Sequence, residues 1–308
     1  TQDRVPTVYI EDGMVVGLDP DDPIEVNYRE NFPGEPTGKE NPEMLKMMWH
    51  HGHFNSIVNG ISRIGFMKGG TGARWVDENM ADTFLVKAQE YIVEHKEEPF
   101  FLYYALQQPH VPRTPHPRFI GSTDLGPRGD VIVEADWCIG ELVKTLDEVG
   151  LLNNTLIIVS SDNGPVLNDG YYDEADTRNG SHTPAGPLRG GKYSLFEAGT
   201  RVPFISYWQG RIEPSVSDAL VSQVDLLSSL ASLVGSQVTG TDSQDLLKVF
   251  LGEEDQGREE LISTQGSDCS GDIPIPFTYA FYVGHWVLFW LLPPRDPYWA
   301  EAKKLSNG

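Results

Sequence analysis

The feature that most constrains the fold is the run Thr-Leu-Ile-Ile-Val-Ser at 155–160, which is followed at once by Ser161, Asp162, Asn163 and Gly164. A short continuous run of apolar and β-branched residues is typical of a strand that is buried on both faces of a sheet. Such strands occur in α/β proteins, where helices cover both faces of a mostly parallel sheet. The polar residues after the run therefore stand at the carboxyl end of a strand, where open α/β sheets place their binding sites.

The segments around this strand alternate between helix and strand patterns. Apolar residues three and four apart predict amphipathic helices over 77–92, 130–149 and 219–234. Two further short apolar runs, at 99–106 and 202–208, predict strands. This alternation predicts an α/β fold with a mostly parallel sheet sandwiched by helices.

The pattern changes after about residue 260, where strand-like and irregular segments replace the alternation. We therefore predict a main α/β domain over 1–260 and part of a small C-terminal α+β subdomain over 261–308. The most apolar stretch, 277–292, is shorter than the ~20 residues of a membrane-spanning helix. Its aromatic and β-branched content predicts a pair of strands and no membrane span.

The formal net charge of the 308 residues is −22. This charge excludes nucleic acid as a partner, because phosphate backbones are bound by basic surfaces. An acidic protein can bind a smaller anion only where a metal ion or clustered cations reverse the local field. An anion site in this chain therefore needs one of these two features.

The two cysteines, Cys138 and Cys269, are too few for a disulfide framework or a zinc site. Cys138 stands among the inward-facing residues of the helix at 130–149, so we expect it to be a small buried apolar residue. Cys269 has no motif around it. The opening residues show no signal-peptide pattern.

Asp162 and Asn163 offer adjacent carboxylate and amide oxygens, which are the ligands that hard cations such as calcium take. Gly164 lets the backbone turn sharply after them. The same three residues also favour an ordinary turn, and for the tripeptide alone a turn that binds nothing is the favoured explanation.

Two further candidate residues are His110, which lies among prolines, and Lys192, which follows two glycines. His110 is followed by Val111 and Pro112, which stiffen its backbone and suit a general acid with a pKa near neutrality. Lys192 follows two glycines, so its ammonium can face an anion where the backbone approaches closely. A structural histidine and a surface lysine are the alternatives for these two residues.

His51 and His53 belong to the sequence Trp-His-His-Gly-His at 49–53. Imidazole groups two residues apart can contact a metal or the hydroxyls of a sugar. A solvated loop without a ligand is the alternative explanation. We keep both residues as candidates for substrate binding.

Three segments together resemble one family. QPHVPRTP at 108–115, EADWCIGELVKTLDEVGLLNNTLIIVSSDNGP at 134–165 and LRGGKYSLFEAGTRVPFI at 188–205 resemble the second half of a type I, arylsulfatase-like sulfatase. That family belongs to the alkaline phosphatase superfamily, whose α/β fold is the one expected here. The resemblance extends from about residue 77 to about residue 265.

The resemblance implies a sulfuric ester hydrolase, with a carbohydrate sulfate as its substrate. Asp162 and Asn163 match two ligands of the family's single calcium ion, which is preferred to magnesium. His110 matches the histidine that faces the sulfate and donates a proton to the leaving oxygen. Lys192 matches the lysine that holds a sulfate oxygen and the bridging oxygen. The family's usual location implies a periplasmic or secreted protein.

The sequence departs from the family pattern in its nucleophile. The family makes a formylglycine from Cys or Ser in a C/S-x-P-x-R motif, and neither Cys138 nor Cys269 stands in one. We expect this motif, and the family's remaining metal ligands, to lie upstream of Thr1. Without them we expect residues 1–308 alone to be inactive, because the covalent route needs the nucleophile.

Two other functions remain open at this point. One is a phosphatase or phosphodiesterase of the same superfamily, in which histidine usually follows the strand-end aspartate because imidazole suits zinc. Asn163 in that place favours a single hard cation and a sulfate ester. The other is a non-catalytic, sulfatase-like protein that binds glycans. The sequence leaves open the identity of the sugar and the oligomeric state.

Overall fold

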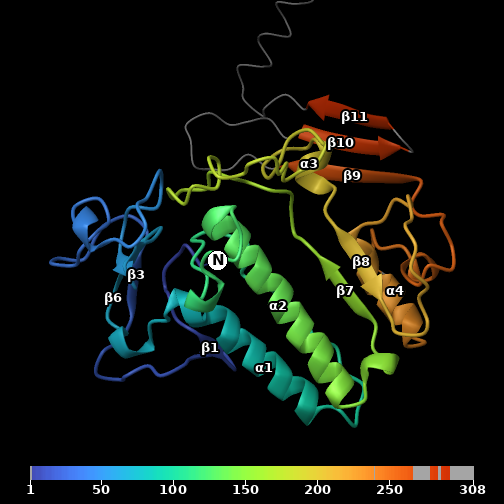
Figure 1. The fold of residues 1–308 in the computed structure, drawn as a ribbon, viewed down its shortest axis with the longest axis horizontal. Coiled ribbons are helices and arrows are strands. Elements are labelled where there is room, and N and C mark those ends of the chain that lie inside the picture. Colours follow the sequence, from blue (N-terminus) through green and yellow to red (C-terminus); the bar gives the residue numbers. More distant parts are fainter. Residues whose placement is uncertain (1, 239, 266–277, 284–285, 292–308) are drawn as a thin grey trace, which may run out of the picture. The chain divides into compact units, whose positions relative to one another are not determined.

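The computed structural model describes residues 2–238, 240–265, 278–283 and 286–291 (Figure 1). By its internal contacts the chain divides into two compact units. The first unit comprises 1–151 with 167–182, and the second comprises 152–166 with 183–308. The domain boundary that we predict at residue 260 is a different division and stays a prediction.

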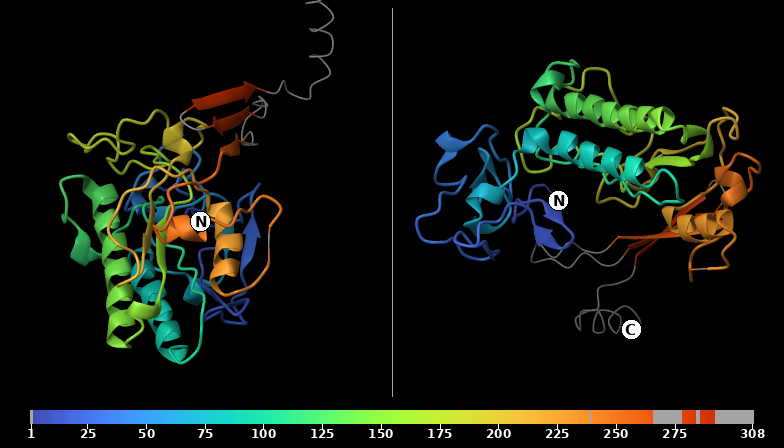
Figure 2. Two further views of the ribbon diagram at one scale, coloured as in Figure 1. Left: turned by 90° about the vertical axis from the view of Figure 1, so that its right-hand side faces the viewer. Right: turned by 90° about the horizontal axis from the view of Figure 1, so that it is seen from below.

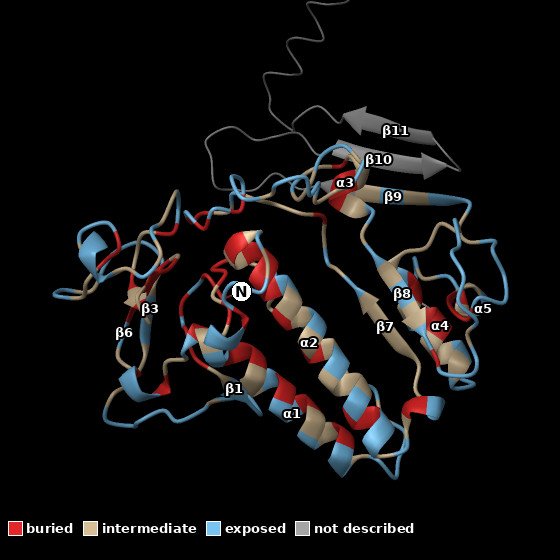
Figure 3. Ribbon diagram, viewed as in Figure 1, coloured by how far each residue is buried: buried red, intermediate tan, exposed pale blue. Residues whose placement is uncertain are grey.

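Two helices form the centre of the first unit. They are α1 (Met80–Glu94) and α2 (Gly126–Glu148), which pack along one another (Figure 2). In α1 the buried residues Leu85, Ala88 and Ile92 are spaced three and four apart, as the periodicity predicts. The predicted helices over 77–92 and 130–149 are thus confirmed. Buried residues gather at the N-terminal end of α2 (Figure 3).

Short antiparallel strands make up much of the rest of the first unit. They are β1 (Ile10–Glu11) with β2 (Met14–Val15), β3 (Glu25–Asn27) with β6 (Phe66–Lys68), and β4 (Ile57–Val58) with β5 (Ile61–Ser62). Asn59 and Gly60 connect β4 to β5 with positive φ angles of 55° and 72°. A two-residue type I′ turn requires positive φ at both positions, and Asn-Gly is its preferred sequence.

A buried ion pair joins distant parts of the first unit. Arg63 Nη2 lies 2.7 Å from Asp77 Oδ2, and both side chains are fully excluded from solvent. Asp77 also accepts hydrogen bonds from Gln2 Nε2 and Asn59 Nδ2, each at 3.1 Å. Arg63 donates to the carbonyl oxygens of Gln2 and Val58 at 2.8 and 3.1 Å. These contacts tie the N-terminal segment and the β4–β5 hairpin to the segment that leads into α1.

The segment 99–106, which we predict to be a strand, forms no strand in the structure. No described strand pairs with this segment, and Phe101 and Tyr103 are 71% and 82% exposed. An apolar run becomes a buried strand only where a neighbouring strand accepts its hydrogen bonds. Within the described residues the segment has no such neighbour, so it connects α1 to the loop that carries His110 without regular secondary structure.

In the second unit, β7 (Ile157–Ser160) pairs with β8 (Phe204–Tyr207). Both strands were predicted from their apolar runs, and both are confirmed. Their direction differs from the prediction, because the pair is antiparallel, with Ile157 opposite Tyr207 and Ser160 opposite Phe204. A parallel pair needs a crossover of a dozen or more residues, usually a helix. The connection at 161–203 is long enough for such a crossover, but it forms only loop and the four-residue helix α3 (Glu197–Thr200), so the usual crossover helix is absent.

The helix predicted over 219–234 is shorter in the structure. It begins with a 3₁₀ turn at Gln223–Asp225 and continues as α4 (Leu226–Leu233). Ser222 and Asp225 form a capping box there, which fixes the start of the helix. A second short helix, α5 (Leu247–Phe250), packs against β8 through the Phe204 and Phe250 rings, whose centroids are 5.1 Å apart.

The C-terminal part of the second unit contains a three-stranded antiparallel sheet in the order β11-β10-β9. Its strands are β9 (Glu260–Gln265), β10 (Thr278–Val283) and β11 (Trp286–Leu291). The pair of strands predicted for 277–292 is confirmed. Among the described helices, none combines the length and the apolar character that crossing a membrane requires. Cys269 lies outside the described residues.

Candidate functional site

The strand-end motif begins immediately after β7. Asp162 is exposed and Asn163 is half-buried. The side-chain amide of Asn163 donates from Nδ2 to the carbonyl oxygen of Gly164 at 2.9 Å. Gln223 Nε2 donates to the carbonyl oxygen of Ser161 at 2.6 Å. These bonds fix the turn and leave Oδ1 as the Asn163 atom that can act as a ligand.

Gly164 is required by the close approach of a neighbouring segment. Its amide donates to the carbonyl oxygen of Gly199 at 2.9 Å. A Cβ atom at this position would lie 1.6 Å from the carbonyl oxygen of Ala198, so only glycine fits. The sequence predicts a sharp turn here, and the structure shows that the turn serves backbone packing.

Lys192 comes from the segment that packs against this turn. Its amide donates to the carbonyl oxygen of Pro165 at 2.9 Å, and a Cβ atom on Gly191 would lie 2.5 Å from the same oxygen. The Lys192 side chain is half-buried, and its Nζ lies 5.1 Å from the centre of the Tyr193 ring. The structure therefore places the segment that carries Lys192 beside the one that carries Asp162 and Asn163.

Asp162 and Asn163 suit a calcium ion in the chemistry of their donors, since calcium binds carboxylate and amide oxygens. They do not complete a site, because calcium takes six to eight oxygen ligands. Among the residues that the structure describes, no group of three or more His, Cys, Asp or Glu side chains is placed to hold a metal ion. These two residues therefore fit as part of a calcium site.

His110 lies in the first unit, on the loop after the segment 99–106. Its Nδ1 lies 2.7 Å from the carbonyl oxygen of Val111. A carbonyl oxygen only accepts hydrogen bonds, so Nδ1 carries a proton in the neutral imidazole as well as in the cation. The contact with Val111 therefore fixes the orientation of the ring and the tautomer of its neutral form. This is the arrangement that a general acid needs.

Two buried side chains hold the loop of His110. Arg113 donates from Nε to the carbonyl oxygen of Pro109 at 2.9 Å and from Nη1 to Asp173 Oδ2 at 2.7 Å. Glu134 of α2 accepts hydrogen bonds from Gln108 Nε2 and from the amide of His116, both at 3.0 Å. Burial raises the pKa of Glu134. The loop is thus fixed on both sides of His110.

Sequence reasoning missed these supporting residues. Arg113 and Glu134 fall inside the family-like segments, but their partners are 60 and 26 residues away, respectively, in Asp173 and Gln108. No periodicity connects such residues. Their only sequence signal is that a charged residue stands among apolar or proline-rich neighbours.

The two candidate histidines for substrate binding have different surroundings. His53 is buried, with Nε2 3.1 Å from Asp3 Oδ2 and Nδ1 2.8 Å from the carbonyl oxygen of His51. Both of its ring nitrogens therefore have partners inside the protein, which is the geometry of a structural histidine. His51 is exposed. Of the two, only His51 presents its ring to solvent.

The predicted site residues divide between the two units. His51, His53 and His110 belong to the first unit, whereas Asp162, Asn163 and Lys192 belong to the second. Within the second unit, the structure confirms that the segment of Lys192 lies beside the segment of Asp162 and Asn163. A single anion-sized hollow that contains His110 together with Lys192 stays a prediction.

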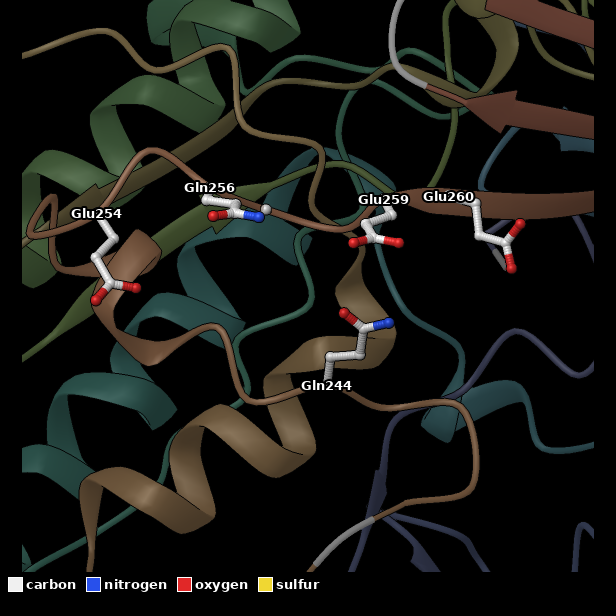
Figure 4. Close-up of a pocket in the computed structure, with 6 residues that line it drawn as sticks. Gln244, Glu254, Gln256, Glu259 and Glu260 are labelled. Atoms are coloured by element: carbon white, nitrogen blue, oxygen red, sulfur yellow. The ribbon is translucent and has the colours of Figure 1, made fainter.

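One hollow of about 630 Å³ lies in the second unit, away from all of these residues in sequence. Gln244, Glu254, Gln256, Gly257, Glu259 and Glu260 line it (Figure 4). None of the six carries a positive charge, and three are carboxylates. Such a lining repels an anion, so this hollow does not suit an anionic substrate.

Comparison with known proteins identifies what the chain is similar to. The family model described as Sulfatase matches residues 21–236. An N-acetylgalactosamine-6-O-sulfatase of Bacteroides thetaiotaomicron is 52% identical over 265 residues, which cover 85% of this chain and 52% of that protein. Bovine arylsulfatase A is 37% identical over 171 residues, 54% of this chain and 32% of that protein.

A solved structure shows the same similarity in three dimensions. It is a protein described within the metabolism of multiple glycosaminoglycans by Bacteroides thetaiotaomicron, with 49% sequence identity and a TM-score of 0.87. The match covers 96% of this chain and 60% of that one. The chain thus spans roughly half the length of the first relatives that it matches.

Proposed function

Because this chain belongs to the sulfatase family, we propose that the protein of which it forms part is a sulfuric ester hydrolase acting on a carbohydrate sulfate. The observation that carries this proposal is the 52% identity to an N-acetylgalactosamine-6-O-sulfatase across 85% of the chain. The fold is the α/β, alkaline phosphatase-like fold that the sequence predicts, as the solved relative with a TM-score of 0.87 shows.

The substrate that we propose to test first is a 6-sulfated N-acetylgalactosamine, alone or within a glycan. The support is the name of the relative from Bacteroides thetaiotaomicron, an N-acetylgalactosamine-6-O-sulfatase. A sulfated glycan also fits the chain's net charge of −22, provided that cations at the site reverse the field locally. We further propose that the protein works in the periplasm or outside the cell, where such glycans are met.

The chain's own residues supply three parts of the proposed chemistry. Lys192 binds a sulfate oxygen and stabilises the negative charge that develops there. His110 donates its Nε2 proton to the leaving alcohol, while the bond from Nδ1 to Val111 keeps the ring oriented. Asp162 and Asn163 would hold a calcium ion, which would supply positive charge to the sulfate oxygens.

The nucleophile is the part that these 308 residues do not supply. Neither cysteine stands in the motif from which the family makes formylglycine. We propose that residues 1–308 expressed alone release no sulfate, and that the complete gene product does.

The test is the release of inorganic sulfate from N-acetylgalactosamine 6-sulfate by the complete gene product. We expect His110→Ala to lower kcat by roughly 10²–10⁴-fold, the usual contribution of a general acid. The 6-phosphate of the same sugar should react far more slowly, because Asn163 replaces the imidazole that suits zinc. Equal rates on both esters would indicate a phosphatase, and no hydrolysis of either would indicate a glycan-binding protein.

A further inference from the structure

Three aromatic side chains gather on the surface of the first unit. His50 and Tyr172 have ring centroids 4.8 Å apart, and those of His50 and His51 are 5.0 Å apart. Nδ1 of His50 lies 2.7 Å from Nδ1 of His51. We call His50, His51 and Tyr172 the aromatic platform. Tyr172 is 62% exposed and His51 is exposed, so the platform presents rings to solvent.

The backbone beneath the platform is held firmly. The amide of His50 donates to the carbonyl oxygen of Gly170 at 2.7 Å, and the amide of Tyr172 donates to that of Met48 at 2.9 Å. Tyr171, between them, is buried, and its hydroxyl donates to the carbonyl oxygen of Ser62 at 2.6 Å. A binding surface on such a base is preorganised, which lowers the entropic cost of taking up a ligand.

The platform is next to the loop of His110. Val111, which follows His110, packs in one buried cluster with Ile61 and Tyr171. Arg113 joins the same two segments through Asp173, which follows Tyr172. The candidate proton donor and the platform therefore belong to neighbouring segments within one unit.

The hydrogen bond between the two imidazoles determines what they offer to a ligand. When both rings are neutral, one Nδ1 donates and the other accepts. The donating ring then has a bare Nε2, and the accepting ring has its proton on Nε2. The pair thus presents one acceptor and one donor. Sugar hydroxyls act in both roles, and a pyranose ring has an apolar C–H face that packs on an aromatic ring such as Tyr172.

We propose that the aromatic platform is a sugar-binding subsite. The Tyr172 ring stacks on the apolar face of a pyranose, and the His50–His51 pair binds hydroxyl or N-acetyl groups of the glycan that carries the sulfate ester. None of the three residues has a fixed charge, so the platform recognises the sugar and not the sulfate. This inference rests on the proposed function, because it names the part of the site that selects the carbohydrate.

The test compares variants of the complete gene product on N-acetylgalactosamine 6-sulfate. Loss of one stacking ring is expected to raise KM roughly tenfold in Tyr172→Ala, with kcat within about twofold. Tyr172→Phe keeps the ring and should stay near wild type. The matched control is His95→Ala, because His95 stacks on Tyr91 at 4.1 Å at the far end of α1. It should leave KM unchanged.

A binding measurement separates this inference from the proposed function. Titration calorimetry with unsulfated N-acetylgalactosamine needs no catalysis, and Tyr172→Ala should weaken the binding by a similar factor. If the wild type hydrolyses no ester, the proposed function fails and calorimetry alone decides the subsite. If KM and sugar binding of Tyr172→Ala stay within twofold of wild type, or if only kcat falls, the platform is not a sugar subsite. Thermal unfolding confirms that each variant is folded.

Discussion

Replacing Asp77 with asparagine should destabilise the first unit far more than its change of one charge suggests. Asp77 Oδ2 accepts from Arg63 Nη2 and Asn59 Nδ2, and Oδ1 accepts from Gln2 Nε2. An asparagine has one oxygen, so its amide nitrogen must face a donor in either orientation. The Arg63 guanidinium meanwhile keeps its charge in a position fully excluded from solvent.

The expected cost is about 3–5 kcal/mol, the range for a buried ion pair that loses one partner. This is a large part of the roughly 5–15 kcal/mol by which a domain is usually stable. For a unit of 167 residues, the size of the first unit, we expect the midpoint of thermal unfolding to fall by roughly 6 °C or more. Circular dichroism during thermal and urea unfolding measures both quantities.

Glu11→Gln is the matched control. Glu11 Oε1 lies 2.7 Å from Lys87 Nζ, the same separation as in the buried pair, but both side chains are more than half exposed. An exposed pair contributes little to stability because water screens it, so this variant should unfold close to wild type. If Asp77→Asn and Glu11→Gln unfold within 1 kcal/mol of each other, the argument from burial is wrong.

Three further outcomes follow from the site and its surroundings. Gly164→Ala should lower the unfolding midpoint of the second unit, because its Cβ would lie 1.6 Å from the carbonyl oxygen of Ala198. It should also lower the sulfate release that we propose for the complete gene product, and normal stability of this variant would contradict the argument. Burial raises the pKa of Cys138 to about 11 from 9.0, so its neutral thiol stabilises the fold fully below about pH 9, and this contribution is lost as pH rises towards 11. Cys138→Ala should flatten that part of the stability profile, and the native thiol should resist alkylation at pH 8. Removal of calcium with a chelator should abolish sulfate release by the complete gene product, and calcium should restore it better than magnesium; full activity after chelation would remove the role given to Asp162.

The sequence predicts the elements that depend on local patterns. The apolar run at 155–160 and the helical periodicity at 77–92 each report which side chains a short segment buries, and both elements are present. The position of Asp162 and Asn163 at a strand end follows from the same reasoning. The direction of β7 relative to β8 does not, because it depends on the path of the long connection between them.

The groups that hold the candidate site could not be predicted in the same way. His53 stands in a polar, glycine-containing stretch that is typical of a solvated loop, yet it is buried against Asp3, 50 residues away. Arg113 and Asp173 are separated by 60 residues. Each contact joins polar side chains that only the folded chain brings near one another, so local periodicity carries no signal for them.

The carbonyl oxygen that His110 contacts belongs to the very next residue. The imidazole is therefore oriented by a contact within its own loop, and that loop is in turn held by Arg113 and Glu134. Substitutions that leave the backbone of this loop in place should therefore keep the orientation of the ring, even where the surrounding side chains change.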